Sequence, residues 1–143
     1  MKCTVIIGQG HKEGVFIYAD KRTEEVDRIE KMLEEVTKEL VGYKGDEIYS
    51  INPLDVFCFT VEEGRVYAHS DKGRLRMKCR LYTLEQDLNS SFVKINQSCI
   101  ANVRKIEKFR ASFSGTLMVE FKNGYKDYVS RRQMKIVKER LGI

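Results

Sequence analysis

The chain has 143 residues, with 26 Lys or Arg against 21 Asp or Glu, so its formal net charge is +5. This length predicts one or two small domains, and a hydrophobic content of 42% excludes wholesale disorder. With 1 Pro and 10 Gly, a collagen-like or linker-dominated chain is excluded as well. The apolar runs are too short to cross a bilayer, and residues 1–8 lack a signal-peptide cleavage site. We therefore expect a cytoplasmic protein.

Cysteine and histidine spacing gives no support for a metal site. No C-x-x-C pair is present, and neither histidine has a cysteine or an acidic residue at ligand spacing. The pattern favours small buried side chains in a reducing compartment over a redox pair. The sequence thus predicts no metal and no cofactor. The residues concerned are Cys3, Cys58, Cys79, Cys99, His11 and His69.

Charge is distributed unevenly along the chain. Residues 1–46 carry 8 basic and 10 acidic side chains, a net charge of −2, whereas residues 47–143 carry 18 basic and 11 acidic, a net charge of +7. A basic segment suits a polyanion, either nucleic acid or an anionic membrane. A solvated basic surface has the same composition, so charge alone leaves these readings open.

The first 45 residues predict two strands and a helix. Strands are expected over residues 2–8 and 15–20, joined by a glycine-rich hairpin loop that lacks the G-K-[ST] ending of a phosphate loop. Thr23 is a suitable N-cap for a helix that Gly42 is expected to end. The apolar stripe of that helix favours packing on the hairpin over a coiled-coil seam, since it spans less than three heptads. It comprises Val26, Ile29, Leu33, Val36 and Leu40.

After Gly45, short strands alternate with turns and two amphipathic helices. Strands are expected at 47–51, 54–61, 66–69, 74–78, 92–95, 109–113, 116–122 and 125–129, and a mostly apolar run at 99–103 leads on to Arg104. Helices are expected around 81–88 and after Ser130, and Asn123-Gly124 is the strongest hairpin signal. In the strand 74–78, Arg74, Arg76 and Lys78 alternate with apolar residues, so one of its faces is cationic.

Four blocks follow one another in this second part: L-Y-T-L-E-Q-D-L at 81–88, a strand-rich segment at 92–106, F-K-N-G at 121–124 and V-S-R-R at 129–132. In order and spacing they resemble the LytTR DNA-binding domain of bacterial transcription regulators. The sequence L-Y-T-L-E-Q-D-L at 81–88 is similar to the family's L-x-x-L-E-x-x-L helix. Residues 92–106, F-V-K-I-N-Q-S-C-I-A-N-V-R-K-I, are similar to its F-x-R-I-H-R-S-x-x-V-N-x-x-x-I segment. F-K-N-G at 121–124 and V-S-R-R at 129–132 are similar to its L-x-N-G and V-S-R-R blocks.

The resemblance implies an α+β protein. Residues 46–143 would form a mostly antiparallel β DNA-binding domain with two short helices, and residues 1–45 a β-β-α leader for dimerisation or sensing. Loops and strand ends, in place of a recognition helix, would enter the major groove. Two features depart from the family pattern: Asn96-Gln97 stands where His-Arg is frequent, and 46 residues cannot hold a receiver domain. The chain resembles small stand-alone members that occur beside a small membrane protein, which implies a functional link.

Several side chains near these blocks suit contacts with double-stranded DNA. An arginine such as Arg132 can bind guanine bidentately, and the amides of Asn96 and Gln97 can pair with adenine. A helix start such as Ser130 suits a phosphate, as do basic residues beside the readout positions. The predicted DNA-binding residues are Arg65, Lys94, Asn96, Gln97, Ser98, Arg104, Lys105, Ser130, Arg131 and Arg132.

We therefore expect a sequence-specific bacterial transcription regulator without enzymatic activity, because no nucleophile–base pair, carboxylate pair or metal cluster is visible. The alternative is a non-enzymatic adaptor whose basic face binds an anionic membrane or an acidic protein. The stripe of the leader helix, together with the paired sites usual for such regulators, leads us to expect a homodimer.

Overall fold

The computed structural model describes residues 4–5, 7–10, 15–88 and 90–143. Its α-helices are α1 (Glu24–Thr37), α2 (Leu81–Asp87) and α3 (Arg131–Leu141), and 3-10 turns span Pro53–Asp55 and Val103–Lys105. Its strands are β1 (Leu40–Lys44), β2 (Glu47–Ile51), β3 (Cys58–Glu62), β4 (Arg65–Ser70), β5 (Gly73–Met77), β6 (Phe92–Asn96), β7 (Cys99–Asn102), β8 (Ile106–Ala111), β9 (Leu117–Phe121) and β10 (Lys126–Val129). Helices and antiparallel strands together confirm the predicted α+β class.

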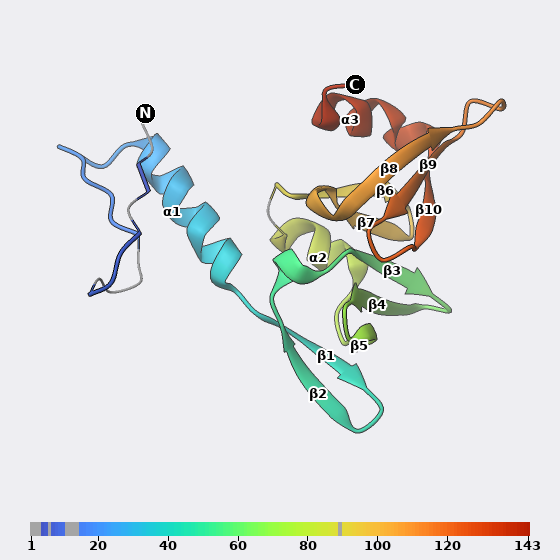
Figure 1. Cartoon of the computed structure of the whole chain (residues 1–143), viewed down its shortest axis with the longest axis horizontal. Coiled ribbons are helices and arrows are strands. Elements are labelled where there is room, and N and C mark those ends of the chain that lie inside the picture. The colour runs from blue at the N-terminus through green and yellow to red at the C-terminus, as the bar shows by residue number, and fades with distance from the viewer. Residues whose placement is uncertain (1–3, 6, 11–14, 89) are drawn as a thin grey trace.

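The strands form two antiparallel sheets (Figure 1). The larger sheet has the order β2-β1-β5-β4-β3-β7-β6, and the smaller has the order β10-β9-β8. On one side of the larger sheet, Leu84 of α2 joins Phe59 in a buried cluster. On the other side, Val119 of the small sheet and Val137 of α3 join Ile95 in a second cluster. The large sheet is therefore the middle layer of the β-domain.

Most elements expected after residue 46 are present within a few residues of their predicted bounds. The strand expected at 54–61 begins later, at Cys58, because Pro53–Asp55 forms a 3-10 turn. The side chain of Asn52 caps that turn by accepting a hydrogen bond from the Leu54 N–H at 3.0 Å. The turn between β3 and β4 places Glu63 and Gly64 at positive φ, 50° and 75°, a conformation that favours glycine at the second position.

The leader helix begins as predicted but ends earlier than predicted. Thr23 is its N-cap and accepts a hydrogen bond from the Val26 N–H at 3.3 Å. The helix ends at Thr37, and Gly42 lies inside β1 instead of ending the helix. A Cβ atom on Gly42 would lie 2.7 Å from the Ile51 Cδ1 atom and 2.8 Å from the Leu75 Cβ atom. This glycine therefore permits the close approach of β1 to the core.

Neither strand of the predicted leader hairpin is present among the residues that the structure describes. Residues 2, 3 and 6 of its first strand lie outside the described residues, and residues 15–20 form no strand. Phe16 and Tyr18 are 72% and 93% exposed, so this segment has no apolar surface to pack on. An isolated two-stranded hairpin is marginal in water without such a surface, which accounts for the difference.

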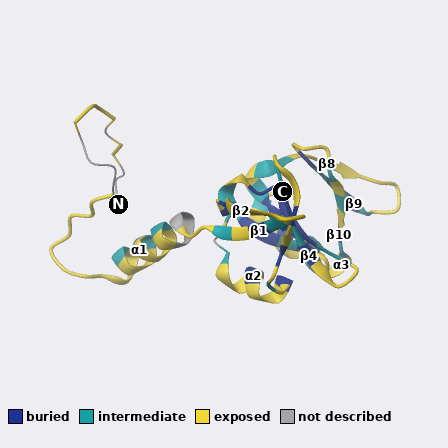
Figure 2. Ribbon diagram, turned by 90° about the horizontal axis from the view of Figure 1, so that it is seen from below, coloured by how far each residue is buried: buried dark blue, intermediate teal, exposed yellow. Residues whose placement is uncertain are grey.

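The leader helix is not packed on a hairpin either, and it projects away from the β-domain (Figures 1 and 2). Val26 and Ile29 remain half-buried, Leu40 belongs to β1, and the Val36 side chain lies outside the described residues. Strand β1 falls in the predicted leader range, yet it pairs with β2 and β5. The division of the chain at residue 45 stays a prediction, and the structure places β1 on the domain side of the link. No described helix is long and apolar enough to span a membrane.

Candidate DNA-binding surface

Backbone hydrogen bonds bring three separate segments to one edge of the β-domain. The Val61 N–H donates to the Ser98 carbonyl at 2.9 Å, which places the β3–β4 turn beside the β6–β7 turn. The Ser130 N–H donates to the Ile95 carbonyl at 2.9 Å, which places the start of α3 beside the same turn. Residues far apart in the sequence thus share one surface.

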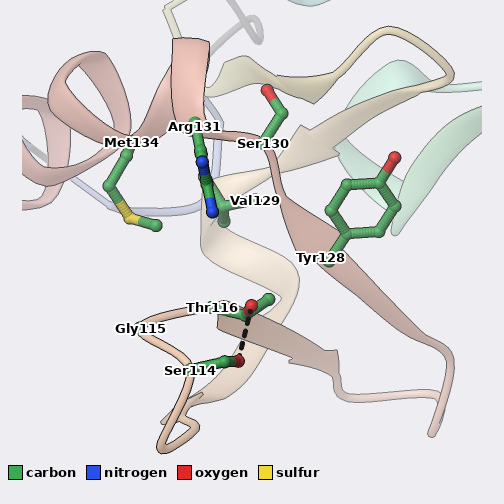
Figure 3. A pocket seen from close by; sticks show the side chains of 8 residues that line it. All are labelled: Ser114, Gly115, Thr116, Tyr128, Val129, Ser130, Arg131 and Met134. Carbon is green, nitrogen blue, oxygen red and sulfur yellow. Dashed lines mark hydrogen bonds between the residues drawn. The ribbon is translucent and has the colours of Figure 1, made fainter.

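A fourth segment, the β8–β9 turn, meets the start of α3 across a hollow of about 260 Å³ (Figure 3). Arg131 lines this hollow opposite Ser114 and Thr116, whose hydroxyls are 3.1 Å apart. Ser112 extends the hydroxyl row, with its Oγ atom 2.8 Å from that of Ser114. We call the four segments together the turn edge; it comprises residues 62–65, 97–98, 112–116 and 130–132.

Six of the ten predicted DNA-binding residues lie on the turn edge. Five of them are exposed, and Ser130 is half-buried as the N-cap of α3, where its side chain makes no capping hydrogen bond. The exposed guanidiniums, the exposed amide and the hydroxyls of these residues can bind base edges and phosphates. The six are Arg65, Gln97, Ser98, Ser130, Arg131 and Arg132.

Asn96 has a structural position instead of the exposed one that base pairing requires. Its side chain is 2% exposed, and its amide donates to the Asp127 carboxylate at 2.9 Å and to the Tyr128 carbonyl at 2.8 Å. Its Oδ1 atom accepts a hydrogen bond from the Ser98 N–H at 2.8 Å. Because both ends of the amide are used internally, Asn96 fixes the β6–β7 turn and presents nothing to a base.

The remaining three predicted residues lie away from the turn edge. Lys94 points to the α2 side of the sheet, with its Nζ atom 3.7 Å from the Glu85 carboxylate. Arg104 and Lys105 lie in the 3-10 turn at the other end of β7. The Lys105 ammonium is 5.3 Å from the centre of the Phe57 ring. The structure therefore does not bring these cations together with Gln97 and Arg132.

A buried polar network lies behind the turn edge. Asp127 accepts hydrogen bonds from the Asn96 amide and, at 3.0 Å, from the Tyr125 hydroxyl, and both burial and this carboxylate raise the pKa of Tyr125. His69 packs on the Tyr125 ring, and its Nε2 atom is 2.7 Å from the Thr60 hydroxyl. Burial lowers the pKa of His69. The network therefore holds β10 against the large sheet through Asn96, Asp127 and Tyr125, with His69 packed beside them.

Sequence reasoning missed the hydroxyl row of the β8–β9 turn. Residues 112–116 read S-F-S-G-T and lie where the strands predicted at 109–113 and 116–122 meet. Alternation of hydroxyl residues in a turn is the signal that points to a polar surface there, although their position beside Arg131 depends on the fold. Among the residues that the structure describes, no group of three or more His, Cys, Asp or Glu side chains could hold a metal ion.

Comparisons with known proteins give consistent matches. The family model described as the LytTr DNA-binding domain matches residues 46–142. Two Staphylococcus aureus proteins, from strains NCTC 8325 / PS 47 and MRSA252, are each 35% identical over 146 residues, covering 100% of this chain and 99% of theirs. Both are named uncharacterized HTH-type transcriptional regulators.

The solved LytTr DNA-binding domain of a response regulator from Bacillus cereus has the same fold. It superimposes with a TM-score of 0.70 at 19% identity, covering 75% of this chain and 99% of that one. The matches to the Staphylococcus aureus proteins extend over the whole chain and so include the leader, whereas the solved domain matches 75% of it. Since the family model spans about two-thirds of the sequence, the chain belongs to the LytTR DNA-binding domain family.

Proposed function

We propose that this protein is a sequence-specific transcription regulator that reads the major groove with its turn edge. The observation that carries the proposal is the convergence of three turns and a helix start, with Arg65, Gln97, Arg131 and Arg132 exposed on one edge. The described helices are each separated along the chain by strands, so the described part contains no helix-turn-helix. Turns and strand ends are then the elements available to enter a groove.

The residues of the turn edge divide by chemistry into base readers and phosphate contacts. Arg132 has the fork geometry for the O6 and N7 atoms of guanine, and the Gln97 amide matches the N6 and N7 atoms of adenine. Ser98, Ser130 and Arg131 suit phosphates, because hydroxyls, guanidiniums and helix starts bind phosphate oxygens without reading sequence. Arg65 at the β3–β4 turn extends the surface along the duplex. Asn96 acts indirectly, by holding Gln97 and Ser98 in place.

The other predicted contacts need a longer stretch of DNA. Arg104 and Lys105 would reach phosphates only on a duplex that continues past the far end of β7. Lys94 is already paired with Glu85, so we expect it to contribute less to DNA affinity than Arg104 or Lys105 does. These three phosphate contacts stay predictions.

We further propose that the protein acts in the cytoplasm as a homodimer on paired sites. The exposed apolar side chains of the leader support self-association, because such surfaces are typical of interfaces. The functional link to a small membrane protein stays a prediction, and so does the absence of enzymatic activity.

A gel-shift titration of the full chain on the DNA upstream of its own gene tests the proposed function. We expect a shifted band that persists in excess nonspecific competitor, because specific complexes typically exceed nonspecific ones by roughly 10³-fold or more in affinity. If the competitor removes the band in proportion to its concentration, the surface is only electrostatic. An adaptor function on an acidic partner or membrane would then be the better account.

A further inference from the structure

Half of one side of the large sheet is not covered by the small sheet. In the strand register, Tyr43 of β1 and Tyr67 of β4 both lie opposite Arg76 of β5, and Ile48 of β2 lies opposite Tyr43. Directly paired residues point to the same side, so these side chains form one row across the sheet. The row continues to Thr60, which lies beneath the layer of the small sheet and is 2% exposed. At the other end of the row, Ile48 is 69% exposed.

This uncovered area combines cations with aromatic rings. On β5, Arg74 lies on the same side as Arg76, because side chains two residues apart share a face. Lys78 directly follows the strand, and its side chain reaches the Tyr43 ring on that side. The Lys78 Nζ atom is 4.3 Å from the centre of the Tyr43 ring, and the Arg74 guanidinium is 4.8 Å from that of Tyr67. We call this area the basic–aromatic face; it comprises Tyr43, Ile48, Tyr67, Arg74, Arg76 and Lys78.

The face has more positive charge than its own neighbours neutralise. Arg74 forms an ion pair with Glu62. Within the described part of the chain, Arg76 and Lys78 have no carboxylate oxygen within 4 Å. The face therefore suits an acidic partner that also has apolar side chains to lay against the tyrosines and Ile48.

The leader helix has the complementary composition. α1 carries six acidic and two basic residues, a net charge of −4. Its half-buried stripe includes Val26 and Ile29, and the helical spacing places Glu25 beside Ile29 and Glu30 beside Val26. α1 thus carries a half-buried apolar stripe bordered by carboxylates, and the helix lies on the opposite side of the molecule from the turn edge (Figure 1).

We propose that α1 of one copy docks on the basic–aromatic face of a second copy, and that the exchange is reciprocal in a two-fold dimer. The proposal deepens, and rests on, the homodimer proposed above. Two α1 helices with a charge of −4 each would repel one another, and their stripe is short for a coiled coil, which disfavours pairing of α1 with α1. In a dimer with reciprocal docking, each copy's α1 stripe and each copy's basic–aromatic face are covered.

The chain geometry favours a partner's helix over the chain's own. Only Lys38 and Glu39 separate α1 from β1, and Lys38 is extended, with φ −75° and ψ 111°. The Ser50 hydroxyl donates a hydrogen bond to the Glu39 carboxylate, which holds this link along β2. With this link, α1 projects away from the β-domain of its own chain (Figures 1 and 2).

Sedimentation velocity of the full chain without DNA, over a range of concentrations, tests this docking. Glu25→Lys and Arg76→Glu should each weaken the dimer by at least about tenfold, because each reversal places like charges in the contact. Glu24→Lys is the control for the helix, since it makes the same charge change in the same turn on the opposite side. Lys126→Glu is the control for the face, as an exposed cation on β10. Both controls should sediment as the wild type does.

Several outcomes would overturn the docking. One is a wild-type chain that is monomeric at all concentrations. Another is a dimer that is lost in Glu25→Lys but kept in Arg76→Glu, because that pattern indicates pairing of α1 with α1. Arg76→Glu that weakens only DNA binding would assign the face to DNA. Circular dichroism establishes that each variant is folded. Binding of a duplex with a single site, measured on the same samples, reports on the regulator function separately from dimerisation.

Discussion

The β-domain and the leader differ in how far their apolar side chains are buried within one chain. In the β-domain, Phe59, Phe121 and Val137 are at most 1% exposed, and each packs within the same chain. In the leader, Phe16 is 72% exposed, and the stripe of α1 is only half-buried. The two clusters of the β-domain are thus buried within one copy, whereas the stripe of the leader helix is not. The two regions should respond differently to the same kind of substitution.

The largest expected difference is in the response to truncation of an apolar side chain. Phe121→Ala should lower the free energy of unfolding by about 3–5 kcal/mol, because it leaves a cavity between the two sheets. Ile29→Ala in α1 should lower it by less than about 1 kcal/mol in a dilute, monomeric sample, since its side chain is only partly covered. Urea denaturation of both variants measures the difference. Equal losses would show that α1 packs on its own domain.

The second comparison is between two adjacent amide side chains, Asn96 behind the turn edge and Gln97 on it. Asn96→Ala should destabilise the protein by about 1–3 kcal/mol, because it removes the hydrogen bonds that Asn96 donates to Asp127 and to the Tyr128 carbonyl and the one it accepts from the Ser98 N–H. Gln97→Ala should leave stability within about 0.5 kcal/mol, since the Gln97 side chain is exposed. Thermal unfolding of the two variants measures this. A stable Asn96→Ala protein would contradict the positioning role.

A smaller effect concerns the pH dependence of the β-domain. Burial lowers the pKa of His69 in the folded protein below its unfolded value of 6.5. Below pH 6.5 the unfolded chain binds a proton that the folded chain does not, so stability is lost as the pH falls from 6.5 through the folded pKa. The urea midpoint should therefore drop more between pH 7.5 and 5.5 in the wild type than in His69→Gln. Equal drops would assign the acid sensitivity to other groups.

The smallest effect is expected for an exposed ion pair of the small sheet. The Lys108 Nζ atom lies 3.7 Å from the Glu120 carboxylate, and the Lys108 side chain is half in solvent. Lys108→Ala should change the free energy of unfolding by less than about 1 kcal/mol, because solvent screens such pairs. Urea titrations at low and high salt should agree closely. If Lys108→Ala clearly lowers the free energy of unfolding at low salt only, the ion pair contributes more to holding β8 against β9 than we expect.

The sequence predicted the elements of the β-domain because turn residues and alternating apolar positions mark them locally. It did not predict the role of Gly42, because the close approach to Ile51 and Leu75 arises only when distant strands meet. The prediction of a strand at 15–20 was wrong for a related reason: strand propensity alone does not supply a surface on which a hairpin can pack. Local pattern thus predicts which element forms, and tertiary contact decides what covers it.

The candidate site was predicted in part for the same reason. The family blocks marked Gln97, Ser130 and Arg132, which the fold places on one edge. They also marked Asn96, whose burial depends on Asp127, a residue 31 positions later. The hydroxyl row at 112–116 carries no family block, and its position beside Arg131 could be recognised only from the structure.

A competition titration on cognate and scrambled duplexes at several salt concentrations tests the central claim, that the turn edge reads sequence. Arg132→Ala should cost about 1–3 kcal/mol on the cognate duplex and relax specificity at one base pair, as expected for a bidentate guanine contact. Lys105→Ala should weaken both duplexes about equally and flatten the slope of log affinity against log salt by about one unit, as expected for a phosphate contact. Equal losses on both duplexes for Arg132→Ala would contradict the account, because the surface would then bind DNA by charge alone.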